Sequence, residues 1–204
     1  MNQRVDLIRH GETPANNKPT IGGLNIHEPL SFQGFQQSRR LSVFALTPET
    51  KLLSSTATRA IRTAEYAYPG VPLVADDAFL EMSQGSLEGQ LRSEAYTPEY
   101  LEAIEKEGWD HRAPGGQSLN EVADAMLEGI ERHSADSNTL VIVSHTTAIR
   151  SLLGRIRKLD QEATILSQKI DFTHITRLID YGKGFEIAFA NLSPKEAAAY
   201  DTMH

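Results

Sequence analysis

Cysteine is absent from this sequence of 204 residues. Its absence excludes disulfide bonds, a thiolate nucleophile, an iron–sulfur cluster and any zinc site built on thiolates. No apolar run is long enough to cross a bilayer, and residues 1–4 lead into the first apolar stretch without the hydrophobic region of a signal peptide. We therefore expect a cytoplasmic protein that does not associate with membranes.

Positive charge is scarce as well. Lys and Arg total 20 against 27 Asp and Glu, which gives a formal net charge of −7, and no long basic run occurs. This balance disfavours binding to nucleic acid, although it leaves room for a local cationic pocket. The sequence also lacks a G-x-x-x-x-G-K-[ST] phosphate loop, a G-x-G-x-x-G helix start and a G-x-S-x-G nucleophile turn. Nucleoside triphosphatases, dinucleotide oxidoreductases and serine hydrolases therefore lose their main support.

Short apolar runs alternate with segments of helical periodicity. The runs are Val5–Ile8, Lys51–Leu53 and Leu140–Val143, and apolar residues recur at three- and four-residue intervals over residues 35–46, 57–68 and 147–156. This alternation predicts a mostly parallel sheet flanked by helices. Near the C-terminus, residues 175–181 and 185–190 flank a Gly-Lys-Gly turn and predict a hairpin. We expect a three-layer, Rossmann-like α/β fold with an antiparallel edge strand.

Two stretches interrupt the alternation, at about residues 17–33 and 76–116. The first is rich in Gly, Pro and Asn, and the second contains a predicted helix from Pro98 to Glu107 that Thr97 caps. Long loops in a compact domain are more often functional than idle. We therefore interpret residues 1–204 as a single domain in which these two insertions wall a pocket.

Polar side chains follow all three apolar runs directly. The segments are residues 9–13 (Arg-His-Gly-Glu-Thr), residues 54–59, which end at Arg59, and residues 144–146 (Ser-His-Thr). Because the carboxyl ends of parallel strands meet at one edge of a sheet, these segments are expected to converge on one crevice. Two histidines and two arginines then share a site.

These residue types suit a phosphate ester. A neutral imidazole attacks phosphorus when its other ring nitrogen is held by a carbonyl or a carboxylate, and we assign this role to His10. Arg9 and Arg59 carry the planar donor fork that grips phosphoryl oxygens in pairs. His145 adds a donor where charge spreads over the equatorial oxygens. This chemistry requires no metal, and the remaining histidines show no metal-ligand spacing.

The leaving alkoxide still needs a proton, which predicts a carboxylic acid at the mouth of the site. Glu81 is the candidate, in a segment with glycines at positions 85 and 89. Composition alone does not choose Glu81 over Glu88 or Glu12.

Taken in order, these motifs resemble those of the histidine phosphatase superfamily, the phosphoglycerate mutase-like clan. The resemblance covers roughly residues 4–150 and is carried by residues 7–13 with Asn16, residues 54–64, Glu81 with residues 85–89, and residues 143–150. It implies that His10 becomes the phosphohistidine, that Arg9, Arg59 and His145 bind the phosphoryl group, and that Glu81 donates the proton. It also implies that Asn16 contacts the phosphate and that catalysis needs no cofactor.

The chain departs from the family pattern at a few positions. Thr146 replaces the usual glycine after the second histidine, where it narrows the pocket or adds a hydroxyl donor to the phosphate site. Ala15 and Gln117 stand where an aromatic residue and a glutamate are common. The segment 114–122 resembles a helix start of the compact phosphatase-like and the cofactor-dependent mutase-like branches, without separating them.

No run of basic residues is present for holding a substrate carboxylate, which favours a phosphatase over a mutase. We therefore expect a cofactor-independent phosphomonoesterase of the histidine acid phosphatase type, acting on small phosphorylated metabolites. Two alternatives stay open: a phosphoglycerate mutase, and an inactive module that binds phosphate without turnover. The physiological substrate and the oligomeric state do not follow from the sequence.

Overall fold

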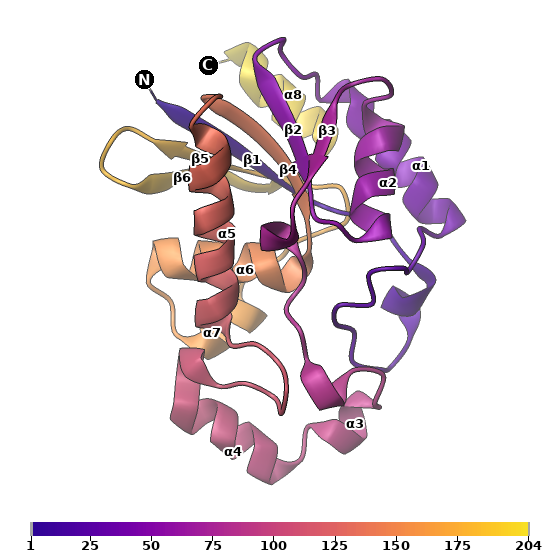
Figure 1. Cartoon of the computed structure of the whole chain (residues 1–204), viewed down its shortest axis with the longest axis vertical. Coiled ribbons are helices and arrows are strands. Elements are labelled where there is room, and N and C mark those ends of the chain that lie inside the picture. The colour runs from indigo at the N-terminus through magenta and orange to yellow at the C-terminus, as the bar shows by residue number, and fades with distance from the viewer. Residues whose placement is uncertain (1, 204) are drawn as a thin grey trace.

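The centre of the molecule is one six-stranded sheet with the strand order β3-β2-β4-β1-β5-β6 (Figure 1). The computed structural model describes residues 2–203. Its strands are β1 (Gln3–Arg9), β2 (Thr50–Ser54), β3 (Leu73–Ala75), β4 (Thr139–Ser144), β5 (Ile175–Asp180) and β6 (Phe185–Leu192). The first four strands are parallel, whereas β5 runs antiparallel to both β1 and β6. The predicted mostly parallel sheet is confirmed, and the predicted hairpin forms its antiparallel edge.

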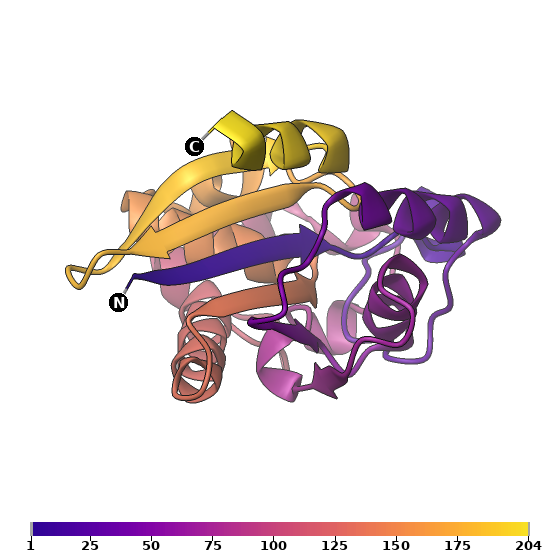
Figure 2. The ribbon, with the colours of Figure 1, turned by 90° about the horizontal axis from the view of Figure 1, so that it is seen from above.

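Helices cover both faces of the sheet (Figure 2). They are α1 (Phe32–Arg40), α2 (Thr58–Ala67), α3 (Arg92–Ala95), α4 (Pro98–Glu107), α5 (Leu119–Ser134), α6 (Thr146–Arg157), α7 (Gln161–Leu166) and α8 (Pro194–Met203). Residues of α5 and α6 pack in one apolar cluster with the sheet, and residues of α2 and α8 pack in a second cluster. The layers are therefore helix, sheet and helix, as the sequence predicted.

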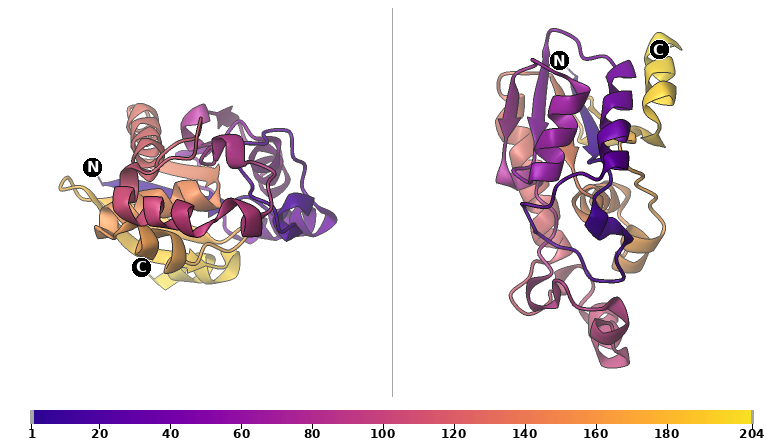
Figure 3. Two further views of the ribbon diagram at one scale, coloured as in Figure 1. Left: turned by 90° about the horizontal axis from the view of Figure 1, so that it is seen from below. Right: turned by 90° about the vertical axis from the view of Figure 1, so that its right-hand side faces the viewer.

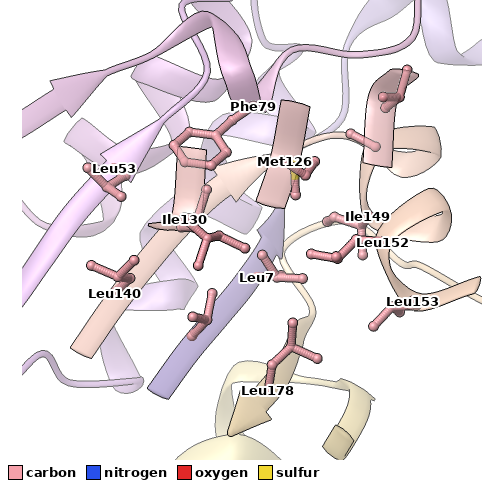
Figure 4. Close-up of a cluster of buried hydrophobic side chains, with 14 of the residues drawn as sticks. Leu7, Leu53, Phe79, Met126, Ile130, Leu140, Ile149, Leu152, Leu153 and Leu178 are labelled. Carbon is pink, nitrogen blue, oxygen red and sulfur yellow. The ribbon is translucent and has the colours of Figure 1, made fainter. Parts of the chain in front are cut away.

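The two apolar clusters divide the central strands residue by residue. In β1, Leu7 belongs to the cluster with α5 and α6, while the next residue, Ile8, belongs to the cluster with α2 and α8. Figure 4 shows Leu7 and Leu140 among Met126 and Ile130 of α5. Each fully buried Leu or Ile contributes about 1.5–3 kcal/mol to the free energy of unfolding. Burial on both faces explains why the apolar run of β4 is uninterrupted and why that of β1 is broken only by Asp6, whose buried carboxylate forms an ion pair with Arg177.

Helix boundaries follow their capping residues. The Thr97 side chain accepts a hydrogen bond from the Tyr100 amide, and α4 spans the predicted residues. Ser118 and Glu121 form a reciprocal capping box at the start of α5. The segment predicted as one helix over residues 35–46 differs. Ser31 caps α1, which begins at Phe32, three residues earlier than predicted, and the α-helix ends at Arg40 and is followed by a short 3-10 turn.

The two predicted insertions lie against each other. Ile21 and Gln90 face each other through hydrogen bonds from the Ile21 amide to the Gln90 carbonyl (2.8 Å) and from the Gly89 amide to the Ile21 carbonyl (2.9 Å). The Glu88 carboxylate joins both segments, because it accepts from the amides of Leu24 and Gln84. The assignment of residues 1–204 to a single domain stays a prediction.

Helix α4, in the second insertion, lies at the opposite end of the molecule from both termini (Figure 3). None of its residues is buried. Within residues 2–203, no helix combines the length and the apolar character that a membrane crossing requires.

Candidate active site

The two site histidines emerge side by side because β1 and β4 are neighbours. Arg9 lies opposite Ser144 in the parallel register, so His10 and His145 both follow directly at the same edge of the sheet. The His10 amide donates to the Ser144 carbonyl (3.0 Å), and the two ring centroids lie 5.0 Å apart. The predicted convergence of these two strand ends is therefore present in the structure.

The backbone after His10 passes very close to α1. A Cβ atom on Gly11 would lie 2.6 Å from the Gly34 carbonyl oxygen, and one on Gly34 would lie 2.0 Å from the Glu12 carbonyl oxygen. Only glycine fits at both positions. The Gly11 amide also donates to the Thr63 hydroxyl of α2 (3.0 Å), so both helices fix the segment that follows the histidine.

The ring of His10 is held in one tautomer. Its Nδ1 lies 2.6 Å from the Gly11 carbonyl oxygen, which can only accept, so Nδ1 carries the proton and Nε2 keeps its lone pair. The side chain is 4% exposed. Burial, with the nearby Arg59 and Arg9, lowers the pKa of His10 well below its usual 6.5, against a weaker opposing effect of the Gly11 carbonyl. Nε2 is therefore unprotonated at neutral pH, and its lone pair is available.

His145 is fully buried at the start of α6. Its Nε2 lies 2.7 Å from the Ser55 hydroxyl oxygen, and among residues 2–203 its Nδ1 has no hydrogen-bond partner. Burial and the positive charge of Arg59 lower the pKa of His145 well below 6.5, so the ring is neutral at pH 7.

Arg9 and Arg59 are anchored by backbone carbonyls. Arg9 donates to the Ile170 carbonyl (2.7 Å), and Arg59 donates to the Asn25 carbonyl (2.7 Å) of the first insertion. Burial lowers the pKa of Arg9 to about 10 and also lowers that of Arg59. Within the described chain, neither guanidinium has a carboxylate within 4.0 Å, so both remain free to bind an anion.

Glu81 lies at the N-terminus of α6, next to these arginines. Its carboxylate accepts from the amides of Met82 (2.9 Å), Thr147 (3.1 and 3.2 Å) and Ala148 (3.2 Å). Its charge acts directly on the two arginines, because it raises the pKa of Arg9 and of Arg59 against the effect of burial. The Glu81 carboxylate therefore lies close to both arginines and to the start of α6, directly after His145.

The two competing carboxylates are occupied elsewhere. Glu88 binds the amides that join the insertions, and its Oε1 also accepts from the Ser83 hydroxyl (3.2 Å). Glu12 accepts from the Ser31 hydroxyl (2.8 Å) at the start of α1. Of the three candidates, Glu81 is the one whose charge acts on both Arg9 and Arg59, and proton donation by Glu81 stays a prediction.

The two remaining predicted phosphate contacts are placed differently. Thr146 is the first residue of α6, is half-buried and follows His145 directly. Asn16 is exposed, and its Oδ1 accepts from the amide (2.9 Å) and the hydroxyl (3.1 Å) of Thr13, so it shapes the turn after the first motif. A phosphate contact at Asn16 or Thr146 stays a prediction.

Phe172 is a site residue that the sequence analysis missed. Its ring centroid lies 3.7 Å from the Arg9 guanidinium carbon and 6.2 Å from the His10 ring. The next residue, Thr173, has a φ of 57°, a conformation unusual for a β-branched residue, and its amide donates to the Arg9 carbonyl (2.9 Å). No motif surrounds Phe172 in the sequence, so only the fold reveals it.

An α/β sheet that presents nucleophilic and cationic groups at one edge of its strands has the layout of a phosphoryl-transfer enzyme. The chain belongs to the histidine phosphatase superfamily (branch 1), whose family model matches residues 5–193. The expected family membership is confirmed. Within residues 2–203, no group of three or more His, Asp or Glu side chains is arranged to hold a metal ion.

Similar proteins include both mutases and phosphatases. The chain is 25% identical over 174 residues to a 2,3-bisphosphoglycerate-dependent phosphoglycerate mutase of Parvibaculum lavamentivorans, which covers 78% of this chain and 82% of that protein. It is 29% identical to Probable phosphoglycerate mutase GpmB of Serratia proteamaculans, over 75% and 74% of the two chains. A mycobacterial glucosyl-3-phosphoglycerate phosphatase shares the fold, with a TM-score of 0.80, 20% identity and coverage of 95% and 100%.

Proposed function

We propose that the protein is a cofactor-independent phosphomonoesterase that hydrolyses small phosphorylated metabolites through a phosphohistidine. The observation that carries this proposal is the state of His10: a buried neutral imidazole whose Nδ1 is bound to a carbonyl and whose Nε2 has no recorded partner among residues 2–203, next to two arginines that form no ion pair within those residues. A neutral ring of this kind is a nucleophile, and the arginines supply the charge that holds its target.

The reaction has two steps. In the first, Nε2 of His10 attacks phosphorus, the bond from phosphorus to the ester oxygen breaks, and Glu81 gives its proton to the departing oxygen. In the second, the oxygen of a water molecule attacks phosphorus, the bond from phosphorus to Nε2 of His10 breaks, and Glu81 takes a proton from the water, so that inorganic phosphate leaves and His10 is restored. Arg9, Arg59 and His145 hold the phosphoryl oxygens throughout, with Asn16 and Thr146 as further contacts.

The order of preference between phosphatase and mutase rests on charge. A mutase must also hold the rest of a phosphorylated acid while the phosphoryl group returns to it, and the sequence offers no run of basic residues for that purpose. The mutase names of two relatives that cover about three quarters of the chain keep phosphoglycerate mutase as the second candidate. An inactive phosphate-binding module is the third.

Hydrolysis of p-nitrophenyl phosphate in the presence of a chelator tests the proposal. We expect the wild type to release nitrophenol and His10→Ala to release none. Wild-type protein that binds phosphate without turnover would establish the inactive module instead.

A second assay separates phosphatase from mutase. The protein is mixed with 3-phosphoglycerate, and both free phosphate and 2-phosphoglycerate are measured. Formation of 2-phosphoglycerate as the main product would replace the phosphatase assignment with the mutase.

A further inference from the structure

Ser55 makes the sole hydrogen bond that the described residues offer to the ring of His145. The hydroxyl oxygen lies 2.7 Å from Nε2, and both residues are fully buried. The other ring nitrogen, Nδ1, is buried without a partner. A buried polar atom left unpaired is costly, so its presence beside His10 indicates a position reserved for a ligand atom.

The contact with Ser55 has two possible directions. A neutral imidazole has one nitrogen that donates and one that accepts. If Ser55 donates to Nε2, then Nδ1 carries the ring proton and can donate to a phosphoryl oxygen. If Ser55 accepts from Nε2, then Nδ1 presents a lone pair, which repels the same oxygen.

The surroundings of Ser55 favour the first direction. The Ala57 amide donates to the Ser55 oxygen (3.4 Å) and occupies one of its two lone pairs. Among residues 2–203, His145 Nε2 is the one recorded acceptor for the hydroxyl hydrogen, and if Ser55 accepted from Nε2 instead, this buried hydrogen would have no acceptor. His10 shows the same arrangement of a ring fixed through one nitrogen, with the Gly11 carbonyl in place of the hydroxyl.

We propose that Ser55 is a positioning residue that donates to His145 Nε2 and thereby fixes the tautomer in which Nδ1–H is available to the phosphoryl group. This inference rests on the proposed function for its catalytic consequence, but not for the tautomer itself. The two histidines then have complementary roles: the Gly11 carbonyl leaves His10 with a lone pair for attack on phosphorus, and Ser55 leaves His145 with an N–H that donates to a phosphoryl oxygen.

The tautomer is measured directly by ¹⁵N–¹H NMR of the histidine rings in ligand-free wild-type protein, with the His145 signals assigned from their loss in His145→Gln. We expect the proton of His145 on Nδ1. A proton on Nε2 would overturn the proposal. This result does not depend on turnover, so it stands even if the protein hydrolyses no ester and the proposed function fails.

Kinetics supply the second measurement. Ser55→Ala is expected to lower kcat for p-nitrophenyl phosphate about 10- to 100-fold, by analogy with the loss of groups that orient metal-bound histidines. Ser55→Thr keeps the hydroxyl and is expected to recover most of that loss. The matched control is Ser151→Ala, which removes another fully buried serine hydroxyl, bound to the Thr147 carbonyl of α6, and leaves kcat unchanged.

Two outcomes would refute the kinetic part. One is a folded Ser55→Ala protein with kcat within about twofold of wild type, a difference too small for the loss of an orienting group. The other is an equal loss in Ser151→Ala, which would attribute the effect to a missing buried hydroxyl in general. If Ser55→Ala does not fold, the tautomer in the wild type decides alone.

Discussion

Replacing Glu81 by glutamine isolates the proton donor. Glutamine keeps the shape of the side chain but has no acidic proton to give. In the proposed mechanism this proton matters in proportion to the basicity of the leaving oxygen. An alkyl phosphate, whose leaving alkoxide is strongly basic, therefore depends on Glu81 far more than p-nitrophenyl phosphate does.

The expected loss of activity follows from what a general acid usually contributes to the rate. General acid catalysis contributes about 10²–10⁴-fold, so Glu81→Gln should lower kcat/KM for an alkyl phosphate by that factor and for the nitrophenyl ester by less than about tenfold. The amide oxygen of glutamine in the place of Oε1 can accept from the amides of Met82, Thr147 and Ala148, and only the longer contact from Thr147 to Oε2 (3.2 Å) is lost. The free energy of unfolding should therefore fall by less than the roughly 1.5–3 kcal/mol that a full hydrogen bond to a charged group contributes.

The assay compares kcat/KM for glycerol phosphate and for p-nitrophenyl phosphate in wild type, Glu81→Gln and Glu88→Gln. Glu88 is the matched control, because Leu24, Ser83 and Gln84 all donate to its Oε1, and glutamine can keep all three bonds. We expect the ratio between the two substrates to change only in Glu81→Gln. Equal slowing of both substrates in that variant would assign the acid role to another group.

Three further predictions concern the histidine, the aromatic contact and the fold. Because burial lowers the pKa of His10, an NMR titration should show its ring neutral at pH 6.5 and protonated only well below that value; protonation near 6.5 would contradict the buried nucleophile. Phe172→Leu removes the aromatic ring that stacks on the Arg9 guanidinium and holds it in place, so calorimetry should show inorganic phosphate binding about 2- to 30-fold more weakly. Phe172→Tyr keeps the ring and should keep wild-type affinity. Burial alone raises the pKa of Asp76, but hydrogen bonds from Ala78 and His133 and the charge of Arg132 outweigh that effect, so the net pKa lies below 3.8. Urea unfolding should therefore show Asp76→Asn less stable than wild type at pH 7, and the difference in free energy of unfolding should disappear as the pH falls below about 4. A difference that persists in acid would refute this account.

Local patterns predicted most of the secondary structure. Apolar runs identified β1 and β4 because both faces of these strands are buried, and Thr97 and Ser118 marked helix starts that the structure reproduces. Strand β3 was missed because it has only three residues at the edge of the sheet, where two of them are exposed. Helix α7 was missed as well, since its six residues are too few to show a helical repeat.

The site residues could be predicted from the sequence only where they follow the ends of parallel strands. His10 and His145 meet because parallel neighbours end at one edge, a rule that can be applied to a sequence. Contacts made to loops have no such rule: Arg9 binds the Ile170 carbonyl, 161 residues away, and Arg59 binds the Asn25 carbonyl, 34 residues away. The choice of Glu81 over Glu88 and Glu12 came from the family resemblance and stays a prediction, because the three glutamates have the same chemistry and the sequence does not show their hydrogen-bond partners.

A second kind of buried arginine in the same protein shows what the site arginines lack. Arg177 is 4% exposed, as deeply buried as Arg59 at 6%, but it forms ion pairs with Asp6 (2.7 Å) and Asp201. Burial lowers its pKa, and the two carboxylates more than reverse that effect, so the net shift is upward. For Arg59 and Arg9 the net shift is downward, because the cost of burying their charge is not offset by a carboxylate in contact. Burying a charge without a partner destabilises a fold, and an anion that binds there recovers part of that cost as binding free energy. A phosphoryl group between the two arginines would supply at the site what Asp6 and Asp201 supply at Arg177, and it would place phosphorus next to the free nitrogen of His10.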